Sequence, residues 1–148
     1  MDKYCLILLL ALASANVMQA QAPEMSTAVD SYQSEELEWG PCPDFMPDGC
    51  KIAVLHGDPA KPNVDILFQV PGGANIPDHW HHSAERMILL SGELHVTYEG
   101  EQTQIMKEGT YAYGPAKKSH VATCKDGKPC TLFIAFEEPL DAFATERK

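Results

Sequence analysis

Three histidines and one glutamate carry the clearest chemical signal in this sequence: His79, His81, Glu85 and His120. In an extended strand alternate residues face the same side, so His79 and His81 present two imidazoles to one point, about 6 to 7 Å apart along the backbone. Neutral imidazoles and a carboxylate suit iron, manganese, nickel, copper or zinc as a divalent ion. The residue types therefore predict a site for one divalent metal ion.

Glu85 shares the parity of the two nearby histidines, but it lies too far along a straight strand to reach the same ion. We therefore expect the chain to bend between His82 and Ala84, as strands do at barrel rims beside active sites. His120 follows much later and is expected to supply the third imidazole from another strand. His82 and His95 have the opposite parity or an outward face, which predicts surface positions for both.

Short apolar runs separated by turn signals fill the chain from about residue 51 onward, which is the pattern of an all-β sandwich or barrel. Hairpin signals stand at Ser91-Gly92 and Glu99-Gly100. The segment 39–50 is rich in proline and glycine and predicts turns with almost no ladder pairing. Strands are expected near residues 50–56, 64–70, 79–82, 86–91, 93–98, 102–106, 110–113, 120–124 and 131–136.

The spacing around the first three site residues matches a known motif. The pattern Gly73-x5-His79-x-His81-x3-Glu85-x6-Gly92 agrees with the first cupin motif at every defined position. The chain therefore resembles the cupin superfamily, and within it the small single-domain cupins of the dioxygenase type and the sensor type related to anti-sigma factors. The resemblance implies a double-stranded β-helix, or jelly-roll barrel, with the metal inside.

The second cupin motif is matched in part. Gly109 and Pro115 fall where the family has its glycine and proline, and His120 falls where it has its fourth ligand. Lys117 stands in place of the usual glycine, and Cys124 stands in place of the usual asparagine. The ligand set that the resemblance implies is intact.

The leading hypothesis is a metal-dependent oxidoreductase of the dioxygenase or oxidase type, acting on a small oxygen-rich molecule such as a diketone, phenol or carboxylate. A protein that binds a metal or ligand without turnover, and a metal-dependent isomerase or lyase, remain alternatives. A homodimer is a further expectation, because dimerisation through barrel edges is common in the family. The apolar lining of the cavity is expected to include Met87, Leu89, Leu94, Val96 and Ile134.

Five further residues near the motifs have expected roles of their own. Tyr98, Tyr111 and Tyr113 are expected mainly as core residues of strands, with the alternative that one hydroxyl lies near the metal. Arg86 is expected to form an ion pair on the barrel surface. Trp80 faces away from the histidines that flank it, which favours packing or a subunit contact.

The N-terminal residues predict an exported protein. A positively charged start, a short apolar run over residues 5–13 and then small residues are typical of a secretory signal peptide, placed here over residues 1–20. That run is too short to cross a bilayer core of about 30 Å, so we expect no membrane attachment after cleavage. An arm and Pro-rich loop over 21–50, a barrel over 51–140 and a tail over 141–148 are expected to follow, in a secreted or periplasmic protein.

Charge and cysteines restrict the partners and the compartment. The sequence has 21 acidic and 11 basic side chains, a net charge of −10, which argues against nucleic-acid binding. Four cysteines lie beyond the predicted signal, as the close pairs Cys42 with Cys50 and Cys124 with Cys130. Four cysteines allow three pairings, and we expect the two local bridges. The remaining partner is a small-molecule substrate or ligand.

Overall fold

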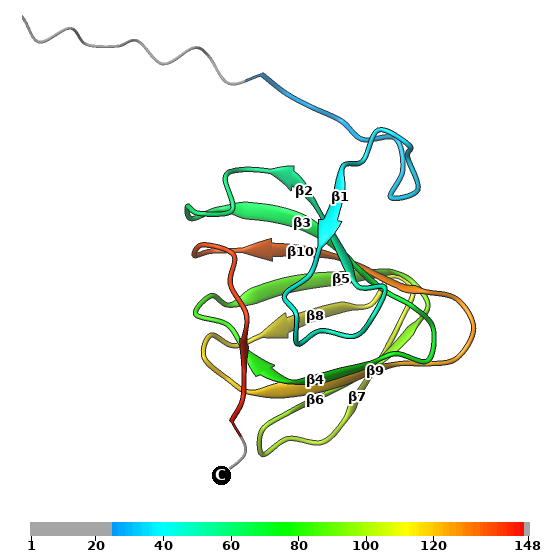
Figure 1. The fold of residues 1–148 in the computed structure, drawn as a ribbon, viewed down its shortest axis with the longest axis vertical. Helices are drawn as coiled ribbons and strands as arrows, with labels where there is room; N and C mark the ends of the chain where they lie inside the picture. Colours follow the sequence, from blue (N-terminus) through cyan, green and yellow to red (C-terminus); the bar gives the residue numbers. More distant parts are fainter. Residues whose placement is uncertain (1–24, 147–148) are drawn as a thin grey trace, which may run out of the picture.

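The computed structural model describes residues 25–146, so the predicted signal peptide lies outside the described part. Two antiparallel sheets face each other, as Figure 1 shows. Within residues 25–146 no helix has the length and hydropathy that crossing a membrane requires. The strands are β1 (Trp39–Pro41), β2 (Lys51–His56), β3 (Val64–Val70), β4 (Asn75–Trp80), β5 (Glu85–Ser91), β6 (Glu93–Tyr98), β7 (Gln104–Lys107), β8 (Tyr111–Gly114), β9 (His120–Cys124), β10 (Cys130–Phe136) and β11 (Phe143–Ala144).

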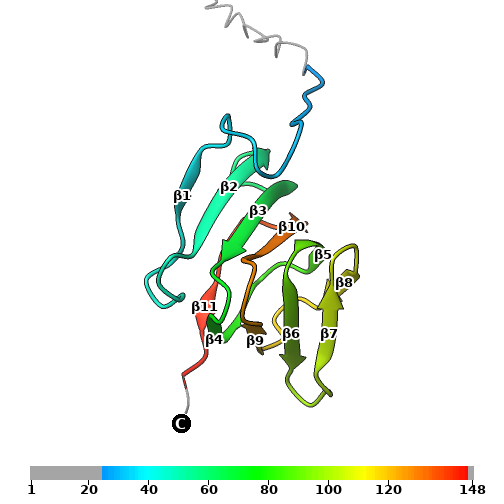
Figure 2. The ribbon, with the colours of Figure 1, turned by 90° about the vertical axis from the view of Figure 1, so that its right-hand side faces the viewer.

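Strand order confirms the predicted all-β jelly roll. One sheet has the order β1-β2-β3-β10-β5-β8, and the other has the order β11-β4-β9-β6-β7. The late strands β9 and β10 each lie between two earlier strands, β9 between β4 and β6 and β10 between β3 and β5 (Figure 2). This crossing brings His120 of β9 next to the first motif, although about forty residues separate them in the sequence.

The core lies between the two sheets and follows from the alternation of the strands. In β6, Leu94, Val96 and Tyr98 are buried while the residues between them are partly exposed. Leu132 of β10 is buried opposite them in the other sheet. Each fully buried aliphatic side chain of this kind contributes roughly 1.5 to 3 kcal/mol, so the barrel is held mainly by apolar burial.

Three local details differ from the sequence-based expectation. The strand expected at residues 79–82 runs instead over Asn75–Trp80, although the expected bend follows it at residues 82 and 83. Part of the Pro-rich segment forms β1, because an edge strand tolerates a proline such as Pro41, which has no N–H to donate. The predicted tail contains β11, which pairs with β4 at the edge of the other sheet.

The expectation that Tyr111 and Tyr113 are core residues is wrong. Both lie on β8, the edge strand of its sheet, and they are 59% and 54% exposed. The inward positions of that strand belong to Ala112 and Gly114, which are small and buried. A strand with two small residues facing the interior leaves room there for side chains from elsewhere, and Tyr98 uses that room.

The two predicted disulfides are present. Cys42 bonds to Cys50 and Cys124 bonds to Cys130, with Cα–Cα distances of 5.6 and 5.8 Å. Both distances lie within the usual range for disulfides. Cys124, which replaces the asparagine of the second cupin motif, is thus buried in a bridge that closes the turn between β9 and β10. Disulfides of this kind are typical of secreted and periplasmic proteins.

The bridges predict a mature chain without free thiols. Alkylation of the protein lacking residues 1–20 under denaturing conditions without reductant should add no mass, since both pairs are bonded. After reduction the same treatment should label four cysteines. Peptide mapping without reduction should find 42 joined to 50 and 124 joined to 130. Labelling before reduction, or cross-linked peptides of another pairing, would contradict the structure.

Candidate metal centre

A row of three rings crosses the five-stranded sheet at one level. His79 of β4 pairs directly with His120 of β9, and His120 pairs with Tyr98 of β6. The ring centroids lie 4.1 Å apart for the two histidines and 4.7 Å apart for His120 and Tyr98. Side chains of directly paired residues point to the same face. The row therefore faces the barrel interior as one surface.

An irregularity in β4 directs His79 into that row. Ile76 pairs with Ala122 and His79 pairs with His120, so β4 contains one residue more than β9 over this stretch. Such a bulge lets two residues that are three positions apart face the same side of the sheet, and both Ile76 and His79 are buried. Within the bulge, the carbonyl of Pro77 accepts a hydrogen bond of 2.7 Å from His79 Nδ1.

Backbone carbonyls orient the other two imidazoles in the same way. His120 Nδ1 donates to the carbonyl of Lys118 at 3.2 Å, and His81 Nδ1 donates to the carbonyl of Asp141. A carbonyl oxygen only accepts, so each Nδ1 carries a proton, and in a neutral imidazole this leaves the lone pair on Nε2. Carbonyl partners that fix the tautomer in this way are the usual supports of metal-bound histidines.

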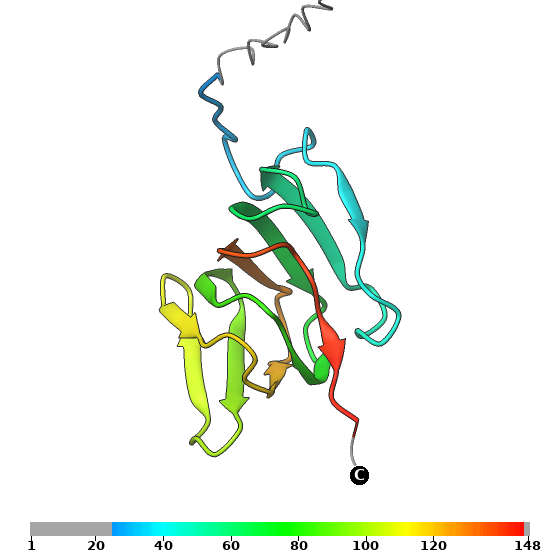
Figure 3. The ribbon, with the colours of Figure 1, turned by 90° about the vertical axis from the view of Figure 1, so that its left-hand side faces the viewer.

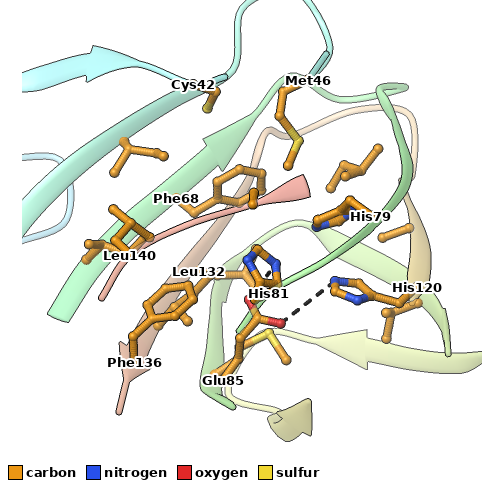
Figure 4. A pocket seen from close by; sticks show the side chains of 18 of the residues that line it. Cys42, Met46, Phe68, His79, His81, Glu85, His120, Leu132, Phe136 and Leu140 are labelled. Carbon is orange, nitrogen blue, oxygen red and sulfur yellow. Dashed lines mark ion pairs between the residues drawn. The ribbon is translucent and has the colours of Figure 1, made fainter. Parts of the chain in front are cut away.

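Glu85 reaches the histidines from the opposite sheet, at the start of β5 (Figure 4). Its Oε1 lies 3.5 Å from His81 Nε2, and its Oε2 lies 3.7 Å from His120 Nε2. Ligand atoms of the three histidines all lie within 4.8 Å of one another. The structure thus brings the four predicted residues together in the interior, with Glu85 next to two of the three imidazoles.

Burial sets the charge state of this cluster. Desolvation lowers the pKa of His79 to about 4, with the neighbouring His81 as the second cause. Desolvation likewise lowers the pKa of His120 to about 3, followed by the effect of His79. Desolvation raises the pKa of Glu85, partly opposed by His81. At neutral pH, His79 and His120 are neutral imidazoles, which is the form that binds a metal.

The residues present fit a metal ion. Among the described residues, His81 Nε2 and the Tyr98 hydroxyl are buried atoms without a hydrogen-bond partner. Buried polar atoms normally have a partner, and an ion is one that satisfies an imidazole lone pair. No Lys or Arg of the described segment lines the cavity around Glu85. A divalent cation would supply both the missing partner and the missing positive charge.

Tyr98 and Gly114 belong to the site, and Gly114 has no sequence signal. Gly114 pairs with Glu85 across β5 and β8. A methyl group on Gly114 would collide with the Tyr98 hydroxyl and come within 3.0 Å of Glu85 Oε2. Burial, with Glu85 as the second cause, raises the pKa of Tyr98, so the phenol keeps its proton. The alternative that one tyrosine lies near the centre therefore holds for Tyr98.

A cavity of about 340 Å³ adjoins the cluster and is lined mostly by apolar side chains. The predicted lining residues present are Met87, Leu94, Val96 and Ile134. Leu89 was expected there too, but it is fully buried in the core and does not line the cavity. The disulfide-bonded loop contributes Cys42 and Met46, and the chain beyond β10 contributes Leu140 (Figure 4).

The surface predictions agree with the structure. His82 is exposed and pairs with Asp141, and His95 pairs with Glu93, both at 2.7 Å. Arg86 forms an ion pair on the surface with Glu137.

Lys117 adopts the conformation expected of the glycine it replaces. Its φ is 60°, and its N–H donates to the carbonyl of His81 at 2.7 Å. A non-glycine residue pays roughly 1 to 2 kcal/mol for this left-handed conformation. The motif turn is therefore kept despite the substitution.

The fold and the residues in the interior define a cupin. The family model of the ChrR cupin-like domain matches residues 27–139, and the chain belongs to this family. No curated protein is significantly similar in sequence.

Solved structures share the fold at low sequence identity. The polyketide cyclase RemF from Streptomyces resistomycificus has a TM-score of 0.67 and 17% identity, covering 84% of this chain and 88% of that one. An RmlC-like cupin from Shewanella frigidimarina has a TM-score of 0.59 and 20% identity, covering 78% and 96%. The DMSP lyase DddQ from Ruegeria pomeroyi has a TM-score of 0.63 and 19% identity, covering 74% of this chain and 61% of that one. The chain thus spans less than two-thirds of that lyase, and these likenesses show the fold alone.

The close approach at Gly114 predicts a specific sensitivity. Gly114→Ala should lower the free energy of unfolding by about 1 to 3 kcal/mol, because the methyl group overpacks Tyr98 and Glu85. Gly40→Ala is a matched control in β1, where the added Cβ would meet its nearest atom only at 3.9 Å. Urea unfolding of both variants measures the difference. Equal stability of the two variants would contradict the described packing.

Acid should destabilise the metal-free protein through its buried imidazoles. In the unfolded chain His79 and His120 have a pKa of 6.5 and become protonated as the pH falls through that value. In the folded protein the pKa is about 4 for His79 and about 3 for His120, so they become protonated only at lower pH. Their contribution to stability is therefore present above pH 6.5 and is lost as the pH falls toward 3. Glu85 acts in the opposite sense, because its pKa is raised.

A variant separates these opposing effects. The His120→Gln variant lacks one of the two buried imidazoles but retains Glu85. Because it loses the contribution of His120, its urea midpoint should fall less steeply between pH 6.5 and 4 than the wild-type midpoint does. The measurement is made on chelator-treated protein. Identical slopes would show that His120 is not held neutral by burial.

Proposed function

We propose that the protein is a metal-dependent enzyme of the dioxygenase or oxidase type, with one divalent ion held by His79, His81, Glu85 and His120. The observation that supports the metal ion is the buried Nε2 of His81, which has no hydrogen-bond partner and faces a second imidazole and a buried carboxyl group. These four residues would hold the ion, and a redox-active ion bound there would supply the means to activate dioxygen or a chelating substrate.

The cavity refines the expected substrate. Its volume of about 340 Å³ is near the lower end for ligand pockets, which favours a small molecule. Apolar side chains such as Phe68, Met87 and Ile134 form the walls, and the polar groups gather at the histidine cluster. The substrate we propose has an apolar body and a single oxygen-bearing end, such as a substituted phenol, diketone or carboxylate.

The buried phenol of Tyr98 favours a second candidate, a metal-dependent lyase or isomerase. Its hydroxyl has no hydrogen-bond partner among the described residues and lies beside Gly114, across from Glu85. Its raised pKa keeps it protonated, so it is a donor to a substrate atom that gains negative charge. Two of the solved structures that share the fold are a DMSP lyase and a polyketide cyclase, which supports considering lyase or isomerase chemistry for this chain.

We further propose that the protein works outside the cytoplasm. The two disulfides support an oxidising compartment, in agreement with the signal peptide predicted over residues 1–20.

Metal analysis and turnover test the proposal together. Protein from an oxidising compartment should contain about one metal ion per chain, and His79→Ala or His81→Ala should lose it, with affinity falling by more than the roughly 10–100-fold typical of outer-sphere changes. With substituted phenols, diketones or carboxylates as substrates, the wild-type protein should consume oxygen faster than the His120→Ala variant does. His95→Ala is the matched control, because His95 is a surface histidine outside the cluster.

The outcomes separate the two chemistries. Oxygen uptake coupled to substrate loss supports the dioxygenase or oxidase. Substrate loss that continues without dioxygen, and falls in Tyr98→Phe, supports the lyase or isomerase. If the histidine variants kept the metal content of the wild-type protein, the substituted histidines would not be metal ligands.

A further inference from the structure

The chain beyond β10 returns across the barrel and lies against β4, as the red segment in Figure 3 shows. We name residues 140–145 the C-terminal strap. The N–H of Leu140 donates to the carbonyl of Pro59 at 2.9 Å, and the N–H of Thr145 donates to the carbonyl of Asp78 at 2.9 Å. Both ends of the strap are therefore tied to other parts of the barrel.

Asp141 lies in the middle of the strap and contacts two adjacent histidines. Its backbone carbonyl accepts from His81 Nδ1. Its carboxylate accepts from the N–H of His82 at 3.0 Å and from His82 Nδ1 at 2.7 Å. One residue thus fixes both the imidazole of His81 and the backbone that follows it.

We propose that the C-terminal strap positions the metal centre, with Asp141 as a positioning residue that holds His81 in the orientation and tautomer needed for binding. The inference rests on the proposed metal site. It assigns a role to a segment expected to be a tail and to His82, expected to be a plain surface residue.

The local structure explains why His81 needs such support. His79 is held within β4 by its pairing with His120, and His120 is held within β9. His81 lies one residue beyond the end of β4, just before the bend, so ladder pairing does not fix it. Of the three carbonyls that orient the imidazoles, those of Pro77 and Lys118 lie two residues from their histidine, whereas Asp141 is 60 residues away.

Aromatic packing keeps the strap in place over this region. Phe143 pairs with Trp80 across β11 and β4, and their rings stack with centroids 4.7 Å apart. The Phe143 ring also meets His82 edge-on at 5.2 Å. Trp80 thus has the packing role expected for it, with the strap as its partner. Metal binding at His81 and docking of the strap then stabilise each other, because each favours the same orientation of the imidazole.

Cobalt(II) binding to the full mature chain tests the inference, with the affinity and the visible d–d spectrum as readouts. Asp141→Ala removes the carboxylate that anchors the strap and should weaken cobalt binding by about 10–100-fold and change the spectrum. Asp141→Asn keeps an acceptor oxygen for the N–H of His82 and should restore part of the affinity. Phe143→Ala should act in the same direction as Asp141→Ala.

The matched control is His95→Ala, which breaks a second histidine–carboxylate pair of the same 2.7 Å length away from the cluster. It should leave both readouts unchanged. A strap with a purely structural role would lower the thermal midpoint of Asp141→Ala and Phe143→Ala but leave the cobalt spectrum as in wild type, and that result would overturn the inference.

His81→Ala separates the inference from the metal site itself. If His81→Ala loses cobalt affinity while Asp141→Ala and Phe143→Ala retain it, the strap has no positioning role and the metal site stands. If His81→Ala also retains full affinity, the proposed metal site fails and the inference fails with it.

Discussion

The site depends on one constraint: three imidazoles must direct Nε2 to a common point while each Nδ1 is held by a backbone carbonyl. Regular strands cannot supply these carbonyls, since their backbone carbonyls already accept hydrogen bonds from neighbouring strands. The three carbonyls come instead from irregular places, the bulge at Pro77, the turn at Lys118 and the strap at Asp141. The departures from regular structure around the centre are therefore the parts that orient it.

The barrel interior adds a second constraint, which is electrostatic. Glu85 comes from the sheet opposite His79 and His120, so the packing of the two sheets places its carboxyl group against the imidazole rings in a largely apolar space. A buried charge without a cation is costly, and a metal ion relieves that cost. The same packing places the Tyr98 hydroxyl over Gly114, where the absence of a side chain leaves room for it. The centre and its apolar cavity are thus two results of one packing arrangement.

The fold class could be predicted because strand periodicity is a local property, and the four residues that meet in the interior could be predicted because they occupy the ligand positions of the two cupin motifs that the sequence resembles. It also indicated the two disulfides, whose cysteines are close in the chain. It placed Tyr111 and Tyr113 wrongly, because apolar character alone does not tell which face of an edge strand is covered. Gly114 and Asp141 had no signal, since their roles arise from contacts between strands that are distant in sequence.

The position of Asp141 also bears on how function is inferred across related chains. The match to the family model ends at residue 139, two residues before Asp141. The support of one imidazole thus lies outside the segment by which membership is recognised. Two proteins with identical motifs can hold that imidazole differently, and they can then differ in metal preference. Agreement of motif residues alone is not a safe guide to shared chemistry.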